Sequence, residues 1–167
     1  LYYKYMEKKK LGQWMLLAVV CLSFSVGEIY AQKHEFADFK RYAKENATLA
    51  QPVKKEKRVV FMGNSITEGW VRTHPDFFKT NGYIGRGISG QTSYQFLLRF
   101  REDVINLAPA LVVINAGTND VAENTGPYNE DYTFGNIVSM AELAKANKIK
   151  VILTPYCLLL HLSGEWK

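Results

Sequence analysis

Short apolar runs alternate with amphipathic segments along this chain, and this alternation constrains its fold more than any other sequence feature. Residues 111–115 form a largely β-branched run that is apolar up to its last residue, which is typical of a strand buried on both faces. Similar runs lie at residues 58–62 and 150–154, and a shorter one lies at residues 83–84. Because helical patterns separate these runs, the sequence predicts an α/β fold with a parallel sheet covered on both faces.

Three amphipathic helices are predicted between and before the strands. Apolar residues recur at helical spacing in three segments: residues 34–50, 94–105 and 134–144. Thr92 or Ser93 can cap the second helix. The charged residues 54–58 follow the first helix and predict a solvent-exposed linker.

Residues 6–31 have the pattern of a signal peptide. Three consecutive lysines precede an apolar run at residues 14–22, and smaller residues lead to Ala31. The run is shorter than the roughly 20 residues that span a bilayer. We therefore expect cleavage after Ala31, a secreted or periplasmic protein and no membrane attachment after cleavage, with a retained anchor as the alternative. The mature chain then has an N-terminal helix and linker at residues 32–57 and one α/β domain at residues 58–167.

The charge balance gives little support to nucleic-acid binding. The chain has 21 Lys and Arg against 16 Asp and Glu, and removing the first 31 residues leaves 17 against 14. So small a surplus makes no basic stripe that could neutralise phosphates. Only Cys157 remains after the leader, so no internal disulfide can form in the mature chain. No His, Cys and Asp cluster has the spacing of metal ligands, and we expect neither a metal nor a cofactor.

Polar, glycine-rich turns follow three of the predicted strands, at residues 63–69, 85–92 and 115–120. Ligands of such sheets lie beyond the carboxyl ends of the strands, so we expect the three turns to meet. The first turn presents a serine near the positive end of the next helix, the second offers backbone N–H groups and the third a side-chain amide. Together these groups make a nucleophile with an oxyanion hole.

The order and spacing of the turns resemble the SGNH/GDSL hydrolase family of esterases and acylhydrolases. Residues 63–67, 88–92 and 117–120 are similar to its first, second and third sequence blocks, within a resemblance that covers about residues 58–155. The resemblance implies a flavodoxin-like three-layer α/β/α fold and a metal-free hydrolysis of esters. The first block and the leader look most like secreted bacterial members that act on small-molecule or carbohydrate esters, including acetylated polysaccharides.

The resemblance also assigns roles within the turns. It implies Ser65 as the nucleophile, with the Gly90 N–H and the Asn119 amide as oxyanion donors. Three further residues of these turns are predicted to bind the substrate: Asn64, Arg86 and Asp120. Structural alternatives stay open: Ser65 can cap a helix, Arg86 can pair with an acidic neighbour and Asp120 can bond loop N–H groups. Gly90 can serve only to permit a turn, and Asn119 only to satisfy loop backbone.

The general base departs from the family pattern. Family members take it from a late Asp-x-x-His block before a final helix, and this chain has no such block. A serine nucleophile needs a base for its proton. Among the three histidines, His34 is expected at the surface and His74 in a loop, where it can line the cleft although its spacing fits no acid-base partner. His161 follows the last strand and can reach the site, but Leu158 stands where the family has aspartate. We therefore expect a prematurely ended domain that lacks its final strand and helix, and an inactive or impaired enzyme.

Two other functions compete with ester hydrolysis. The first is a non-catalytic remnant of the same fold that still binds a carbohydrate or acyl group. The second is a nucleotide-binding domain, which the turns disfavour because they have neither the spacing nor the lysine of a phosphate-binding loop. The sequence gives no signal for the oligomeric state.

Overall fold

A computed structural model describes residues 35–53 and 56–154 of the chain. The predicted leader and the residues that follow Thr154, with Cys157 and His161 among them, lie outside the described residues, as does His34. The chain divides into two units after Phe36, and the fold described here belongs to the unit that begins at Ala37. The elements in chain order are α2 (Lys40–Thr48), β1 (Val59–Gly63), α3 (Ser65–Thr73), α4 (Pro75–Asn81), β2 (Tyr83–Gly87), α5 (Ser93–Asp103), the 3-10 helix η1 (Ile105–Leu107), β3 (Leu111–Asn115), α6 (Thr118–Val121), α7 (Glu130–Ala146) and β4 (Lys150–Leu153).

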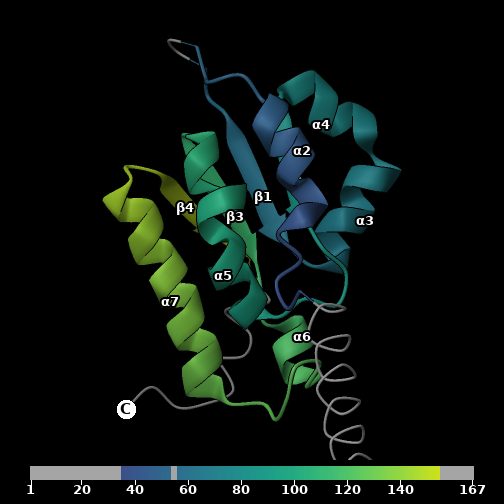
Figure 1. The fold of residues 1–167 in the computed structure, drawn as a ribbon, viewed down its shortest axis with the longest axis vertical. Coiled ribbons are helices and arrows are strands. Elements are labelled where there is room, and N and C mark those ends of the chain that lie inside the picture. The colour runs from purple at the N-terminus through teal and green to yellow at the C-terminus, as the bar shows by residue number, and fades with distance from the viewer. Residues whose placement is uncertain (1–34, 54–55, 155–167) are drawn as a thin grey trace, which may run out of the picture. The chain divides into compact units, whose positions relative to one another are not determined.

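The four strands form one parallel sheet in the order β2-β1-β3-β4 (Figure 1). In the register of the sheet, Val60 of β1 lies opposite Ile84 of β2 and Val112 of β3, and Val112 lies opposite Val151 of β4. The prediction of an α/β fold with a parallel sheet is thus confirmed. Because all strands run the same way, the turns that follow β1, β2 and β3 leave from one edge of the sheet.

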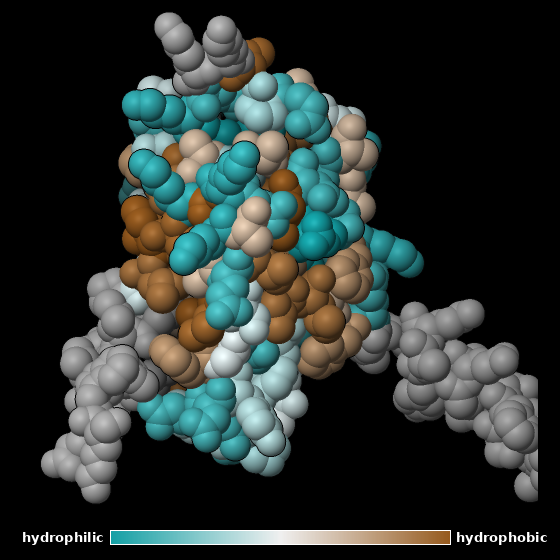
Figure 2. All heavy atoms as spheres, turned by 90° about the vertical axis from the view of Figure 1, so that its left-hand side faces the viewer, coloured by the Kyte–Doolittle hydropathy of each residue, from teal (hydrophilic) through white to brown (hydrophobic). Residues whose placement is uncertain are grey.

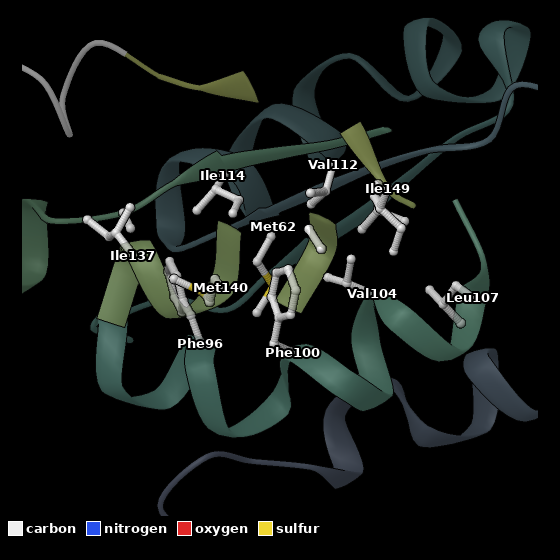
Figure 3. Close-up of a cluster of buried hydrophobic side chains, with 13 residues drawn as sticks. Met62, Phe96, Phe100, Val104, Leu107, Val112, Ile114, Ile137, Met140 and Ile149 are labelled. Atoms are coloured by element: carbon white, nitrogen blue, oxygen red, sulfur yellow. The ribbon is translucent and has the colours of Figure 1, made fainter. Parts of the chain in front are cut away.

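The main hydrophobic core lies between one face of the sheet and helices α5 and α7 (Figure 3). Side chains alternate along a strand, so Val60 and Met62 of β1 both reach this face and are fully buried. The remaining members of the cluster come mainly from β3 and the two helices: Phe96, Phe100, Val104, Leu107, Val112, Ile114, Ala116, Ile137, Met140, Ala144 and Ile149. This packing fixes the frame from which the polar turns project.

An aromatic cluster on α3 and α4 covers the opposite face over β1 and β2. Phe61 of β1 lies 5.4 Å from Trp70 and 5.3 Å from Phe78, measured between ring centroids. Towards β4 this cover ends, since Ile152, which shares a row with Val113 and Phe61, is 50% exposed. Figure 2 views the molecule from the side of α7 and β4 and shows hydrophobic side chains at its surface there.

All three predicted helices differ from their predicted bounds, and α7, at Glu130–Ala146, extends beyond the predicted residues 134–144 at both ends. The first helix begins at Lys40 instead of residue 34, because Asp38 has a left-handed backbone with φ 51° that interrupts the helical path. The helix capped by Thr92 ends at Asp103, and a short 3-10 helix replaces its predicted last turn. Helices α4 and α6 were not predicted, since seven and four residues are too short to show a period. None of the helices in residues 35–53 and 56–154 is long and apolar enough to cross a membrane.

Arg58 corrects the prediction that the linker before β1 lies wholly in solvent. Its side chain is buried, and its guanidinium donates to the carbonyl oxygens of Leu107 and Ala50, at 2.8 Å each, and to Glu56 at 2.9 Å. Leu107 is the last residue of η1 and Ala50 follows α2, so neither carbonyl has an intrahelical donor. The fork of Arg58 satisfies both and so ties the segment after α2 to the segment before β3.

Candidate active site

The three polar turns predicted to meet are hydrogen-bonded to one another at the carboxyl edge of the sheet. The first follows β1, the second β2 and the third β3, and β1 lies between the other two strands. At least one hydrogen bond joins each pair of turns. Ile88 N donates to Gly63 O at 3.0 Å, Asn64 Nδ2 to Thr118 Oγ1 at 3.1 Å, and Asn119 Nδ2 to Gln91 O at 2.8 Å. The segments that resemble the three family blocks therefore form one continuous structure.

Ser65 is the first residue of α3 and is exposed. Asn64 caps this helix, because its Oδ1 accepts a hydrogen bond from Ile66 N at 3.0 Å. Ser65 is therefore not the capping residue. No described residue forms a hydrogen bond with its hydroxyl, and its N–H points out of the first turn, at the positive end of a nine-residue helix. This environment favours negative charge on a group that approaches Ser65.

Asn64 was predicted to bind the substrate, and the structure places it inside the protein. It is 1% exposed. Its side-chain oxygen accepts the capping bond of α3, and its side-chain nitrogen donates to Thr118. The bond to Thr118 fixes the first turn against the third. The placement supports a positioning role for Asn64.

Gly90 lies at the third position of a tight turn in which Gln91 N donates to Ile88 O at 3.3 Å. Its φ of 79° is left-handed, as a type II turn requires at this position, and glycine adopts it without strain. The turn is held from the side by Glu68 of α3, whose carboxylate accepts hydrogen bonds from the backbone N–H of Ser89, at 2.9 Å, and from its hydroxyl.

Glu68 is a site residue that the sequence did not reveal. Its pKa lies below the ordinary value, chiefly because the Ser89 hydroxyl bonds to the carboxylate, with further help from Arg41 at 3.2 Å. The contact with Ser89 depends on how α3 packs against β2, which no local pattern encodes.

Asn119 lies in α6 and donates one N–H of its amide to Gln91 O. A carboxamide nitrogen carries two hydrogens, and no described residue accepts the second. The bond to Gln91 also settles which way round the amide lies, since a carbonyl oxygen can only accept. One oriented N–H of Asn119 is therefore left for a ligand.

Asp120 was also predicted to bind the substrate, and its contacts support the structural alternative. It is 5% exposed, and its carboxylate accepts from Ser93 N at 3.0 and 3.1 Å, from the Ser93 hydroxyl, and from Thr133 Oγ1 at 3.3 Å. The carboxylate thus binds the start of α5, a position where negative charge is favourable.

Arg86 is likewise occupied by the protein. Its Nε and Nη2 donate to Asn46 Oδ1 at 2.9 and 2.7 Å, and its Nη1 donates to Glu45 at 3.4 Å. The guanidinium also lies 4.6 Å from the ring centre of Tyr42. Burial lowers the pKa of this arginine. Arg86 therefore pairs with an acidic neighbour on α2, which is the alternative that the sequence left open.

His74 lies away from the site. It follows the last residue of α3, whose first residue is Ser65, so the length of the helix separates the two by about 13 Å. Its Nδ1 lies 2.9 Å from Thr73 Oγ1. It is the one histidine in the part of the chain that the structure describes, and that part also holds no group of three His, Cys, Asp or Glu residues able to bind a metal ion.

Comparison with known proteins identifies the family. Residues 61–165 match the model of the GDSL-like Lipase/Acylhydrolase family, which is more than half of the chain. The chain belongs to this family. Among proteins similar to this GDSL-like chain, Esterase TesA of Pseudomonas aeruginosa is 33% identical over 96 residues, which cover 55% of the chain and 46% of TesA.

Solved structures agree with this assignment. A GDSL-like lipase from Bacteroides thetaiotaomicron is 93% identical with a TM-score of 0.70, covering 71% of this chain and 58% of that one. An acetyl xylan esterase is 28% identical with a TM-score of 0.50, covering 57% of this chain and 56% of that one. The chain thus spans about half to three fifths of the length of these relatives.

Proposed function

We propose that this chain carries the nucleophile and the oxyanion site of a carboxylic ester hydrolase. One observation carries the proposal: hydrogen bonds join the turns of Ser65, Gly90 and Asn119 pairwise at one edge of the sheet. The free hydroxyl of Ser65 and the unused amide hydrogen of Asn119 give these turns a nucleophile and a donor. Membership of the GDSL-like family supports the same chemistry.

In the proposed reaction, Ser65 Oγ attacks the carbonyl carbon of the ester and gives its proton to a base. The carbonyl oxygen becomes negative as the tetrahedral intermediate forms. The N–H groups of Ser65 and Gly90 and the free N–H of Asn119 donate to this oxygen, which lowers the barrier because the donors are already oriented. The intermediate expels the alcohol, which takes up a proton, and water then hydrolyses the acyl group from Ser65.

The proposed substrate is a small acyl ester, with an acetylated carbohydrate as the preferred class. The likeness to an acetyl xylan esterase at 28% identity supports this class. The leader pattern in residues 6–31 supports a secreted or periplasmic site of action, where polysaccharides are met.

The proposed activity of this chain is low, because no described residue can serve as the base for Ser65. His74 lies at the far end of α3, and a serine hydroxyl without a base is a poor nucleophile. The same observation favours a second candidate function, a remnant that binds a carbohydrate or acyl group without turnover.

Hydrolysis of p-nitrophenyl acetate by four proteins tests the proposal. These are the chain itself, a chimera in which Thr154 is followed by the matching C-terminal part of the Bacteroides thetaiotaomicron relative, the chimera with Ser65→Ala, and the full relative. We expect rates near background for the chain and for the Ser65→Ala chimera, and clear turnover by the other two. Similar circular dichroism spectra of the two chimeras show that the substitution leaves the fold intact.

Each outcome decides between the candidates. A folded chimera with no turnover that depends on Ser65 would contradict the hydrolase site. Rapid turnover by the chain itself, lost with Ser65→Ala, would contradict the low activity and point to His161 or another base. Binding of acetylated xylo-oligosaccharides without turnover by any Ser65-containing form would favour the remnant.

A further inference from the structure

Arg99 is a fully buried cation beneath the three turns. It lies on α5 and is 0% exposed. Its Nη1 donates to the carboxylate of Asp103 at 2.7 Å, and burial lowers its pKa. Nε and Nη2 donate to three uncharged oxygens: Gln91 Oε1 at 2.6 Å, Arg86 O at 2.9 Å and Gly63 O at 3.1 Å.

These three oxygens belong to the segments that carry the proposed site. Gly63 ends β1, two residues before Ser65, and Arg86 lies near the end of β2. Gln91 belongs to the second turn, where its N–H closes the turn around Gly90. One guanidinium therefore joins the ends of two strands to the second turn.

Gln91 connects Arg99 to Asn119 through hydrogen bonds. Its backbone oxygen accepts from Asn119 Nδ2 at 2.8 Å, while its side chain is held at both ends, by Arg99 at Oε1 and by Ala37 O, to which Nε2 donates at 2.9 Å. With its side chain held in this way, the main chain of Gln91 has little freedom to shift. The direction of the free Asn119 N–H thus depends on the position of the Gln91 main chain. That position depends in turn on the bond from Arg99 to the Gln91 side chain.

We infer that Arg99, acting through Gln91, is a positioning residue that aligns the Gly90 and Asn119 donors on one oxygen beside Ser65. The inference rests on the proposed function. Burying a charge is costly, and an apolar side chain of similar volume often stabilises a core equally well. Alignment requires an arginine, since its planar fork offers five N–H donors in fixed directions, whereas lysine offers a single rotating ammonium group.

The test records ¹⁵N–¹H spectra of the full chain and of three variants, with sodium acetate as the probe for the oxyanion site. Arg99→Lys keeps the charge and loses the fork, and Gln91→Met removes the side-chain link. Asp103→Asn is the matched control, because it alters the buried partner of Arg99 without touching Gln91. The readouts are the signals of the Gly90 N–H and the Asn119 NH₂, the Kd for acetate and the melting temperature.

We expect Arg99→Lys and Gln91→Met to shift the Gly90 and Asn119 signals and to weaken acetate binding by about tenfold, the order of one lost hydrogen bond to a charged group. Asp103→Asn should lower the melting temperature and leave both signals and the Kd unchanged. If Arg99→Lys does not fold, Gln91→Met decides the matter alone.

The two ideas fail in different ways. If the variants lose stability as the control does while the Gly90 and Asn119 signals stay in place, Arg99 is only a core residue and the inference is overturned. If acetate moves neither signal in the unsubstituted chain, the proposed oxyanion site fails. The variant spectra without acetate still decide whether Arg99 orients Asn119.

Discussion

At the scale of single residues, most polar side chains around the site hold the protein together instead of facing a ligand. Asn64, Arg86 and Asp120 were predicted to bind the substrate, and all three are buried with their polar atoms bonded to neighbouring turns or helices. A position after a strand tells where a residue lies along the sheet. It does not tell which way the side chain turns, because that depends on packing between distant segments.

The lowered pKa of Glu68 predicts a pH-dependent contribution to stability. Its carboxylate is stabilised by Ser89 and Arg41 in the folded chain, so its pKa falls below the ordinary value of 4.5. A group with a depressed folded pKa contributes stability above its unfolded pKa and loses that contribution as the pH falls through the folded value. Glu68→Gln should therefore lower the melting temperature most near pH 7 and progressively less below pH 4.5. An equal loss at all pH values would contradict this account.

Arg86 provides a test between a structural and a substrate-binding role. Arg86→Lys keeps the charge but loses the paired bonds to Asn46, so we expect the free energy of unfolding to fall by about 1–2 kcal/mol. Acetate affinity, measured by the same titration as above, should not change. A weaker affinity for acetate at unchanged stability would instead support a substrate-binding role for Arg86.

At the scale of elements, α3 and β2 approach each other so closely that only glycine fits between them. A Cβ built on Gly87 would lie 2.3 Å from Glu68 N and 2.8 Å from Asn64 O, both backbone atoms of the first turn and α3. The close approach places Glu68 beside Ser89 and so brings the second turn to Ser65. From the sequence, the glycines of this turn were predicted to let backbone N–H groups approach a ligand. In the structure, Gly87 instead allows close packing between the helix and the strand.

This contact predicts opposite effects for two alanine substitutions. Gly87→Ala should destabilise the protein by about 1–3 kcal/mol, since neither backbone segment can move away freely. Gly69→Ala is the matched control within α3, where no described atom outside the local backbone of the helix lies within 4 Å of the added Cβ. It should stabilise the protein by about 0.5–1 kcal/mol. Urea unfolding of both variants measures the difference. Comparable stability of the two would contradict the close packing.

The strands could be predicted from the sequence and the short helices could not, because only the strands leave a hydrophobic pattern that is visible within their length. Residues 111–115 are fully buried on the core face and half-buried on the other, and a continuous apolar run predicts such a strand. Helix α4 spans seven residues that pack through Phe78, and a segment of that length shows no period of 3.6 residues. The interruption at Asp38 is a single left-handed residue, which no periodic pattern encodes.

At the scale of the whole molecule, the sheet brings distant turns together and the buried polar network aligns them. Ser65 and Asn119 are more than fifty residues apart in the chain, yet the parallel order β2-β1-β3 places the turns that carry them at the same edge. The sequence predicted this meeting from topology alone, because carboxyl ends of parallel strands share an edge. It did not reveal Arg99 or Glu68, since a charged residue in an amphipathic helix is ordinarily expected in solvent.

The most direct test of the central claim is a crystal structure of the chain with bound acetate. We predict one carboxylate oxygen within hydrogen-bonding distance of both Gly90 N and Asn119 Nδ2, with the acetate carbon next to Ser65 Oγ. Acetate bound elsewhere, or these three groups directed to separate regions of the surface, would contradict the account.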